Sequence, residues 1–452
     1  MKSINFLVLL IALIAFVSND SIGQATIAPV KIVYPNGISV TAPTSLVVAG
    51  PKKDQLYFTG SKSGGFGLYR VTSASSLAEE LMVDERKLTL VATIGRRNLI
   101  RRDEGLELFR YLLLAPRPST PLPIGTELIP GSAPLDRGVL DWNVGTQGSR
   151  FVVQGVSSST DTDPYLLDTL GTQTLLKDIA QGPNRGAFHV VSAGARTFFM
   201  DGGTSDAGPG LWQTDGTSAG TTLLRRWQGD GLWRFAPMVA AGNKIYFKAA
   251  DTANNEELWV SDGSASGTKL VKEINPDPAK GSETSFVGVL GTKLLFTATD
   301  GTLGNPSGVV HSLWITDGTA QGTMKLSVCD RSGGIAIVGM QVYFARKGTN
   351  TANGALDLYQ TDGTLAGTKF VTTITGLDEL YSSGNSLFYL TKEVQQFKLQ
   401  KFNTKTKKGT LVQLPAGGRT LGRAPGYSTA MGGWLYFTAD LDGNGEALWK
   451  VQ

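Results

Sequence analysis

The sequence is poor in the residues on which many hydrolytic and redox sites depend. Its 452 residues include one cysteine, Cys329, and two histidines, His189 and His311. A single cysteine excludes an internal disulfide, and the usual nucleophile and metal-binding motifs built on His or Cys are missing. We therefore expect packing alone to stabilise the chain, and we expect catalysis based on histidine to be poorly provided for.

Long apolar segments and a strong net charge are missing as well. The 42 basic and 38 acidic residues are spread along the chain and give a net charge of +4, which leaves no electrostatic footprint for nucleic acid. The longest apolar run, residues 6–17, is too short to cross a bilayer of about 30 Å. It follows one lysine and precedes Ser21 and Gly23, small residues suited to a signal-peptidase site. The sequence thus predicts a signal peptide over residues 1–23 and an exported domain over 24–452, secreted or periplasmic, with no transmembrane segment.

Glycine and repetition are what the sequence has in abundance. It holds 56 glycines and writes one stretch four times: "LWQTDGTSAGT" from Leu211, "LWVSDGSASGT" from Leu258, "LWITDGTAQGT" from Leu313 and "LYQTDGTLAGT" from Leu358. An apolar triplet such as "IYF" at Ile245 precedes each copy and recurs through most of the chain at intervals of 45 to 49 residues. Four β-rich runs in a unit of this length are typical of a propeller blade rather than a helical or leucine-rich repeat.

The number of blades depends on one weak region. The interval from Tyr57 to Val152 is 95 residues, about twice the usual period. This doubled interval predicts a further, degenerate copy of the repeat near Leu99. In that copy, Leu108 and Phe109 replace the Leu-Trp pair of the repeated stretch. The proline-rich zone that follows could instead be an insertion in a smaller ring. The predicted fold class is all-β, a β-propeller of eight or nine four-stranded blades, and the spacing favours nine.

The two ends of the chain are predicted to meet. The last period stops at Gln452 after its third strand, and residues 30–34 form a spare strand before the first full period. We expect this N-terminal strand to complete the last blade and close the ring, which removes an exposed sheet edge. The segment "SSLAEELM" near Leu77 is the one place where an amphipathic helix is suggested.

The repeated stretch carries turn chemistry. Its Asp can accept a hydrogen bond from the N–H two residues on, and the Gly that follows suits a positive φ. The second Gly, at 220, 267, 322 and 367, lets the chain re-enter the sheet, and the Thr beside it can bond back across the turn. A metal or sugar ligand in every blade is less favoured, because single carboxylates would be spread around the rim rather than converge.

The repeat also resembles a known family. "EELWVSDGSASGTKLVKEI" from Glu256 to Ile274 is similar to the tandem ELWxSDGTxxGTxLVKDI repeats of exported bacterial proteins assigned to propeller-like folds. The resemblance is strong over residues 188–374 and weaker elsewhere, and it implies a repeat architecture rather than an activity. The turn also resembles the Asp-box turn of sialidase-type propellers, which is structural there.

Loop carboxylates are the candidates for chemistry. A glycosidase or lyase could assemble its acid and base from loops of different blades. Each candidate is also explained as an ordinary hairpin-turn acid, and the two histidines as a solvated loop residue and a strand-edge residue. The candidate carboxylates are Asp201, Asp206, Asp251, Glu256, Asp300 and Asp440.

One segment has the spacing of a metal site. "DLDGNGE" places Asp440, Asp442, Asn444 and Glu446 at alternate positions, as in the opening of a calcium loop. The distal glutamate of such a loop is missing, because Val451 occupies its place. Both a calcium site and an ordinary turn are open interpretations. No catalytic residue and no other cofactor is predicted.

The function predicted from these observations is binding. We expect an exported, non-catalytic, monomeric propeller whose loops on one ring face bind an unknown protein or glycan of the cell envelope or the environment. The alternative is a carbohydrate-active hydrolase or lyase that uses loop carboxylates. A third possibility is a structural module that docks into a larger envelope assembly.

Overall fold

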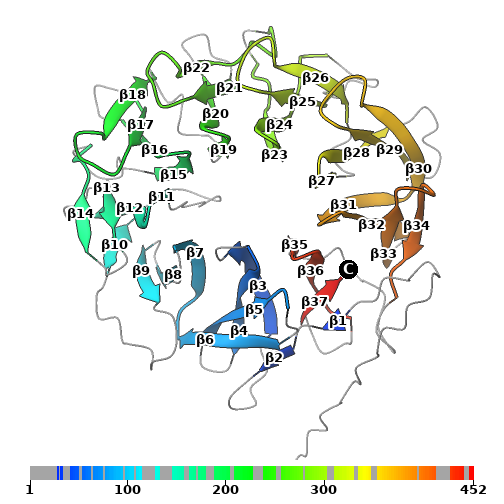
Figure 1. The fold of residues 1–452 in the computed structure, drawn as a ribbon, viewed down its shortest axis with the longest axis horizontal. Coiled ribbons are helices and arrows are strands. Elements are labelled where there is room, and N and C mark those ends of the chain that lie inside the picture. Colours follow the sequence, from blue (N-terminus) through cyan, green and yellow to red (C-terminus); the bar gives the residue numbers. More distant parts are fainter. Residues whose placement is uncertain are drawn as a thin grey trace, which may run out of the picture.

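The structure, a computed structural model, is a ring of β-sheets (Figure 1). The prediction of an all-β propeller with four-stranded blades is confirmed. The proposed signal peptide lies outside the described residues. These residues are 28–29, 31–33, 41–49, 53–62, 65–74, 77–94, 97–105, 108–114, 128–132, 145–156, 162–168, 172–179, 188–203, 208–227, 238–250, 256–277, 280–302, 310–329, 334–347, 354–393, 396–413, 428–441 and 447–452.

The described strands form nine sheets that follow one another around the ring in chain order. The first four consist of β3 (Thr41–Ala49), β4 (Gln55–Lys62), β5 (Gly65–Thr72) and β6 (Leu77–Asp84), joined by β2 (Lys31–Val33); β7 (Leu88–Ile94), β8 (Arg97–Gly105), β9 (Leu108–Leu114) and β10 (Leu128–Ser132); β11 (Gly145–Gln147), β12 (Arg150–Val156), β13 (Thr162–Leu167) and β14 (Gln173–Leu175); and β15 (Phe188–Ala193), β16 (Arg196–Asp201), β17 (Gly210–Thr214) and β18 (Thr222–Arg226).

The other five sheets continue the same pattern. They consist of β19 (Val239–Ala241), β20 (Lys244–Ala250), β21 (Glu256–Ser261) and β22 (Lys269–Leu270); β23 (Ser285–Leu290), β24 (Lys293–Ala298), β25 (Ser312–Thr316) and β26 (Met324–Val328); β27 (Ile335–Val338), β28 (Gln341–Lys347), β29 (Ala355–Thr361) and β30 (Lys369–Thr375); β31 (Leu377–Ser383), β32 (Ser386–Glu393), β33 (Gln396–Asn403) and β34 (Lys408–Leu411); and β35 (Ser428–Met431), β36 (Trp434–Ala439) and β37 (Ala447–Val451), joined by β1 (Ala28–Pro29).

The hydrophobic core lies between neighbouring sheets. The first strand of a sheet lies nearest the centre of the ring, and the fourth lies at the outer rim (Figure 1). Second strands such as β16, β24 and β36 are buried at successive residues, and so on both faces, because each sheet packs against a neighbour on either side. Trp227, which follows β18, meets Phe247 and Trp259 of the next sheet edge to face, with ring centroids 5.7 and 5.5 Å apart. Such contacts form a separate apolar cluster between one sheet and the next.

The N-terminal segment joins the first and last sheets of the ring. β1 pairs antiparallel with β37, with Ala28 opposite Lys450, whereas β2 pairs in parallel with β6, with Lys31 opposite Leu77. Residues 30–34 were expected to pair with the last sheet. The strand that does so begins at Ala28, because the segment crosses the junction and its later residues extend the first sheet instead.

Two further expectations need correction. "SSLAEELM" does not form a helix: its later residues begin β6, which has partners on both sides, β5 and β2. In the weak region, Leu99 and Ile100 of β8 are opposite Leu113 and Leu112 of β9. Ile100 is opposite Leu112 as Phe247 is opposite Trp259, so Tyr111 and Leu112 hold the place of the usual Leu-Trp pair, and Leu108 lies three residues too early for it.

Candidate functional site

The repeated motif forms four near-identical turns, which we call the DGT turns: residues 215–221, 262–268, 317–323 and 362–368. In the first, Asp215 Oδ1 accepts the backbone N–H and the hydroxyl of Thr217, at 2.9 and 2.7 Å. Thr221 donates its hydroxyl to the Thr217 carbonyl at 2.6 Å. Gly216 has φ 87°, and a Cβ on Gly220 would lie 2.0 Å from Asp215 Oδ1. The hydrogen bonds and the glycine geometry predicted from the sequence are present.

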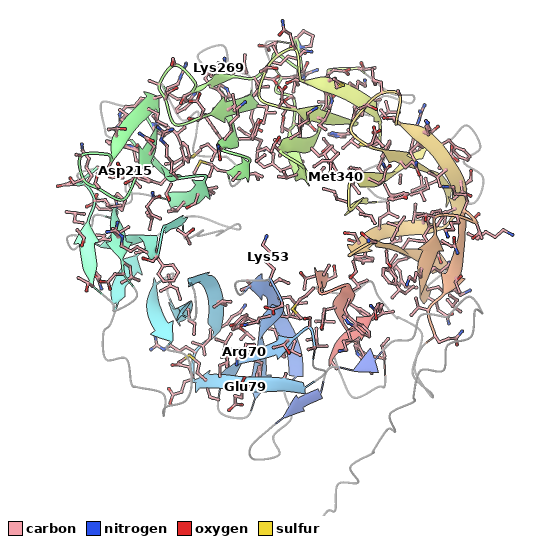
Figure 2. All side chains as sticks on the ribbon, in the orientation of Figure 1. Lys53, Arg70, Glu79, Asp215, Lys269 and Met340 are labelled. Carbon is pink, nitrogen blue, oxygen red and sulfur yellow. The ribbon has the colours of Figure 1, made fainter. Side chains whose placement is uncertain are left out.

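The DGT turns also link one sheet to the next. Arg196 at the start of β16 donates to the Asp262 carbonyl at 3.0 Å, and Lys244 of β20 donates to the Asp317 carbonyl at 2.7 Å. The hydroxyl of Ser264 and its backbone N–H hold the pKa of Asp262 below its ordinary value. In Figure 2 the labelled Asp215 lies towards the outer part of the ring. These carboxylates are thus spread around the ring, and each is bonded within its own turn.

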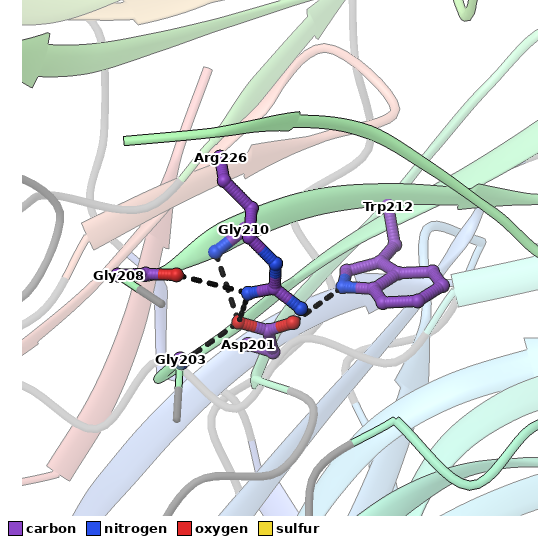
Figure 3. A network of polar contacts seen from close by, with 6 residues as sticks. All are labelled: Asp201, Gly203, Gly208, Gly210, Trp212 and Arg226. Atoms are coloured by element: carbon purple, nitrogen blue, oxygen red, sulfur yellow. Dashed lines mark hydrogen bonds and ion pairs between the residues drawn. The ribbon is translucent and has the colours of Figure 1, made fainter. Parts of the chain in front are cut away.

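Among the loop carboxylates, Asp201 is fully buried and has the largest set of partners (Figure 3). Its Oδ1 accepts the N–H groups of Gly203 and Gly210 at 2.8 and 2.9 Å and an Arg226 N–H at 3.0 Å. Its Oδ2 accepts the indole N–H of Trp212 at 2.5 Å. This carboxylate closes the hairpin between β16 and β17, and it does not face a ligand.

Two further described candidates, Glu256 and Asp300, form ion pairs within their own sheets. Glu256 lies 2.8 Å from Lys248, and Asp300 lies 2.9 Å from Lys325. Burial opposes ionisation of Asp300, but hydrogen bonds from Lys325 and Thr302 outweigh it and lower the pKa of Asp300 to about 2. Asp206 and Asp251 lie outside the described residues. The candidates that are described belong to different sheets and do not converge on one site.

The predicted calcium segment is only partly described. Asp440 is exposed directly after β36, while Asp442, Asn444 and Glu446 lie outside the described residues. Within the described ranges no three His, Cys, Asp or Glu side chains gather closely enough to hold a metal ion. The calcium site therefore stays a prediction.

The two histidines lie in different sheets. His311 precedes β25, and its Nε2 is 3.5 Å from a carboxylate oxygen of Glu283. His189 lies in β15, where the register shifts, and its φ of 52° is unusual for a residue other than glycine. The structure does not bring these two side chains into one site.

A buried acid that the sequence reasoning passed over is Glu257 in β21. It is 1% exposed, and its carboxylate accepts the backbone N–H groups of Asn275 at 3.0 Å and Ile274 at 3.3 Å. Burial is the main cause that raises its pKa to about 7. No alternating pattern marks it in the sequence, because β21 is buried along its length after the half-buried Glu256. Asp163 takes the same place in β13 and accepts the N–H of Ile179.

A second feature missed from the sequence is a hollow of about 370 Å³ in the inner wall of the ring. Its lining mixes aliphatic side chains, hydroxyls and one carboxylate. The carboxylate is that of Glu379, whose Oε2 accepts the Tyr381 hydroxyl at 2.6 Å. Most lining residues come from the innermost strands of four sheets, and Leu435 comes from β36, the second strand of the last sheet. Those from innermost strands include Val287, Ile335, Ile337, Ser382, Ser428, Thr429 and Ala430.

The Glu379 and Tyr381 pair is held rigidly. Tyr381 is 8% exposed, and its burial, together with the hydrogen bond to Glu379, raises its pKa well above the ordinary value. Among the described groups no hydrogen bond reaches the other oxygen of Glu379, Oε1. The hollow thus presents one carboxylate oxygen on a wall that is otherwise uncharged.

Comparisons with known proteins identify no family. No family model matches the chain, and no curated protein matches it. Three solved structures with similar folds are a puromycin hydrolase (12% identity, 88% of this chain and 58% of that one, TM-score 0.39), a eukaryotic initiation factor (9%, 85% and 89%, 0.49) and an oligogalacturonate lyase from Vibrio parahaemolyticus (8%, 95% and 97%, 0.40). The chain spans 58% of the length of the hydrolase. Identities this low say nothing about activity.

Proposed function

We propose that this chain is an exported, non-catalytic binding propeller whose ligand contacts the inner-wall hollow. The hollow is the observation that carries the proposal. Its volume of about 370 Å³ lies within the range of small-ligand pockets, roughly 300–1,000 Å³. It is lined by hydroxyls and aliphatic groups from neighbouring sheets, as expected for a surface that fixes part of a larger partner. The partner is a protein or a glycan met outside the cytoplasm.

The use of the described carboxylates supports binding over catalysis. An acid–base pair for glycoside chemistry needs two carboxyl groups within about 5–10 Å on either side of one bond. Asp201 is enclosed by its own hairpin, and Glu256 and Asp300 are paired with lysines in separate sheets. The alternative, a carbohydrate-active hydrolase or lyase, is kept as an outcome of the test below.

The architecture we propose is a ring of nine blades, one for each sheet, closed by the N-terminal segment. The pairing of β1 with β37 and of β2 with β6 supports this closure. We also propose membership of the exported family with ELWxSDGTxxGTxLVKDI repeats, because its motif forms the DGT turns. Within the described residues no helix is long and apolar enough to cross a membrane.

The binding proposal is tested by filling the hollow. Ala430→Trp places a large side chain in its lining, and Ala219→Trp, on an exposed DGT turn, is the matched control. The purified mature chain and both variants are applied to arrays of peptides and of envelope glycans. We expect a bound class that Ala430→Trp weakens at least tenfold and Ala219→Trp does not. Equal binding by all three proteins, or release of cleaved glycan by the wild type, would overturn the proposal.

We further propose that calcium binds at Asp440, Asp442, Asn444 and Glu446, with an affinity of roughly 10⁻⁴ to 10⁻³ M, as in extracellular modules. A ligand that binds only the folded state raises stability by about 2.7 kcal/mol at a hundredfold excess over Kd. Millimolar calcium should therefore raise the melting temperature, and Asp442→Ala should abolish the rise. Identical melting curves in calcium and in chelator would reject the site.

A further inference from the structure

We infer that the inner-wall hollow binds a lysine or arginine side chain presented by a partner protein, with Glu379 as the specificity-determining residue. The inference rests on the proposed binding function and names the chemistry of its ligand. Among the described residues that line the hollow, Glu379 alone carries a charge. A hydrogen bond to an ionised group is about twice as strong as one between two neutral groups, and a cationic donor adds Coulomb attraction to the carboxylate.

The rest of the lining fits the stem of such a side chain. Val287, Ile335, Ile337 and Leu435 come from three strands, β23, β27 and β36, and give the hollow an aliphatic wall. Lysine and arginine carry three or four methylene groups below their charge and bury them along apolar surface while the charged end finds a partner. The volume of about 370 Å³ corresponds to about twelve water molecules at roughly 30 Å³ each. It holds one long side chain and its backbone.

The orientation of Glu379 favours a cation over a sugar. Tyr381 fixes one carboxylate oxygen and leaves Oε1 for the ligand. The same tyrosine is the one aromatic residue in the lining, and it is buried, so it offers no exposed ring face for a sugar to stack on. The hydroxyls of Ser382, Ser428 and Thr429 remain as acceptors for further N–H groups.

Fluorescence anisotropy with short labelled peptides tests the inference. The probes are five-residue alanine peptides whose central residue is lysine, norleucine or glutamate. We expect the lysine peptide to bind at least tenfold more tightly than the norleucine peptide, and Glu379→Gln to remove that difference. Glu85→Gln, which removes an exposed charge after β6, should leave it intact. Raising the salt concentration should weaken lysine binding to the wild type but not to Glu379→Gln.

Tyr381 acts as a positioning residue, and Tyr381→Phe should reduce the preference for lysine while keeping its salt dependence. Equal binding of the lysine and norleucine peptides, both lost in Ala430→Trp, would reject the cation and leave the binding function standing. Peptide binding that neither Ala430→Trp nor Glu379→Gln changes would reject both the cation inference and the proposed binding function of the hollow. Preference for the glutamate peptide would also overturn the inference.

Discussion

At the scale of single residues, each position of the DGT turn has a separate structural role. The Asp side chain bonds two groups of the residue two positions on, the first glycine takes a positive φ, and the second glycine leaves room for the carboxylate. All of these partners lie within seven residues of one another. Local chemistry of this kind is readable from sequence, which is why the turns could be predicted in detail.

The first prediction concerns the second DGT turn, residues 262–268. Asp262→Ala removes two hydrogen bonds to Ser264 and should lower the free energy of unfolding by about 1 kcal/mol. Gly263→Val should cost more, because Gly263 has φ 88° and its Cβ would lie 2.6 Å from Arg196 Cδ. Urea denaturation of both variants measures their free energies of unfolding and shows which substitution costs more. A folded Asp262→Ala protein of unchanged stability that lost its ligand would show that the turn acid is functional.

The second prediction is the pH dependence due to Glu257. Its pKa rises from 4.5 in the unfolded chain to about 7 in the fold, so the folded state holds the proton more tightly. The resulting stability, about 3 kcal/mol, is fully present below pH 4.5 and is lost as the pH rises to 7. In Glu257→Gln, the free energy of unfolding should no longer decrease between pH 4.5 and 7 for this reason.

The comparison for this prediction is Glu256→Gln, which alters the neighbouring, more exposed residue paired with Lys248. Unfolding free energies are measured from pH 4.5 to 8 for the wild type and both variants. The wild type and Glu256→Gln should lose stability over this range relative to Glu257→Gln. Three parallel curves would show that Glu257 does not titrate with a raised pKa.

At the scale of elements, tertiary pairing overrides local propensity. "LAEELMVD" has the composition of a helix, but β6 has strands on both sides, so its backbone groups are satisfied in a sheet. The inner-wall hollow is a feature that no single element could have revealed. Its residues come from β23, β27, β31, β35 and β36, strands that belong to four sheets whose first strands begin at residues 285, 335, 377 and 428. No local pattern marks them, because the site exists only when several sheets stand side by side.

The third prediction concerns the hairpin of β16 and β17. Asp201→Ala leaves the buried N–H groups of Gly203, Gly210 and Trp212 without their acceptor, and each such group costs about 1–3 kcal/mol. We expect a loss of about 3 kcal/mol and a change in the fluorescence of Trp212. Asp300→Ala, which breaks the more exposed pair with Lys325, should cost about 1 kcal/mol. Equal losses in the two variants would contradict the enclosed role of Asp201.

At the scale of the whole molecule, the ring depends on how its first and last sheets meet. Leu56, Phe58 and Tyr69 of the first sheet share one apolar cluster with Tyr436 and Leu448 of the last. The N-terminal segment adds backbone pairing to both sheets across the same junction. The repeat period predicted that the ends would meet. The period could not predict which residues of the N-terminal segment pair with which strand. The five residues of β1 and β2 pair with two different strands and do not contain the repeated motif.

The last prediction follows from that junction. Deleting residues 24–33 from the proposed mature chain, residues 24–452, removes β1 and β2, exposes an edge on the last sheet and takes a partner from β6. The lost backbone pairing should lower the unfolding free energy by about 2–4 kcal/mol. The apolar cluster at the junction remains, so the variant should still fold, with a lower melting temperature. Deleting only residues 24–27 is the control, since it removes no described strand. If both truncated proteins melt with the full mature chain, the N-terminal segment does not close the ring, and the contact between Leu56, Phe58 and Leu448 alone holds the two sheets together.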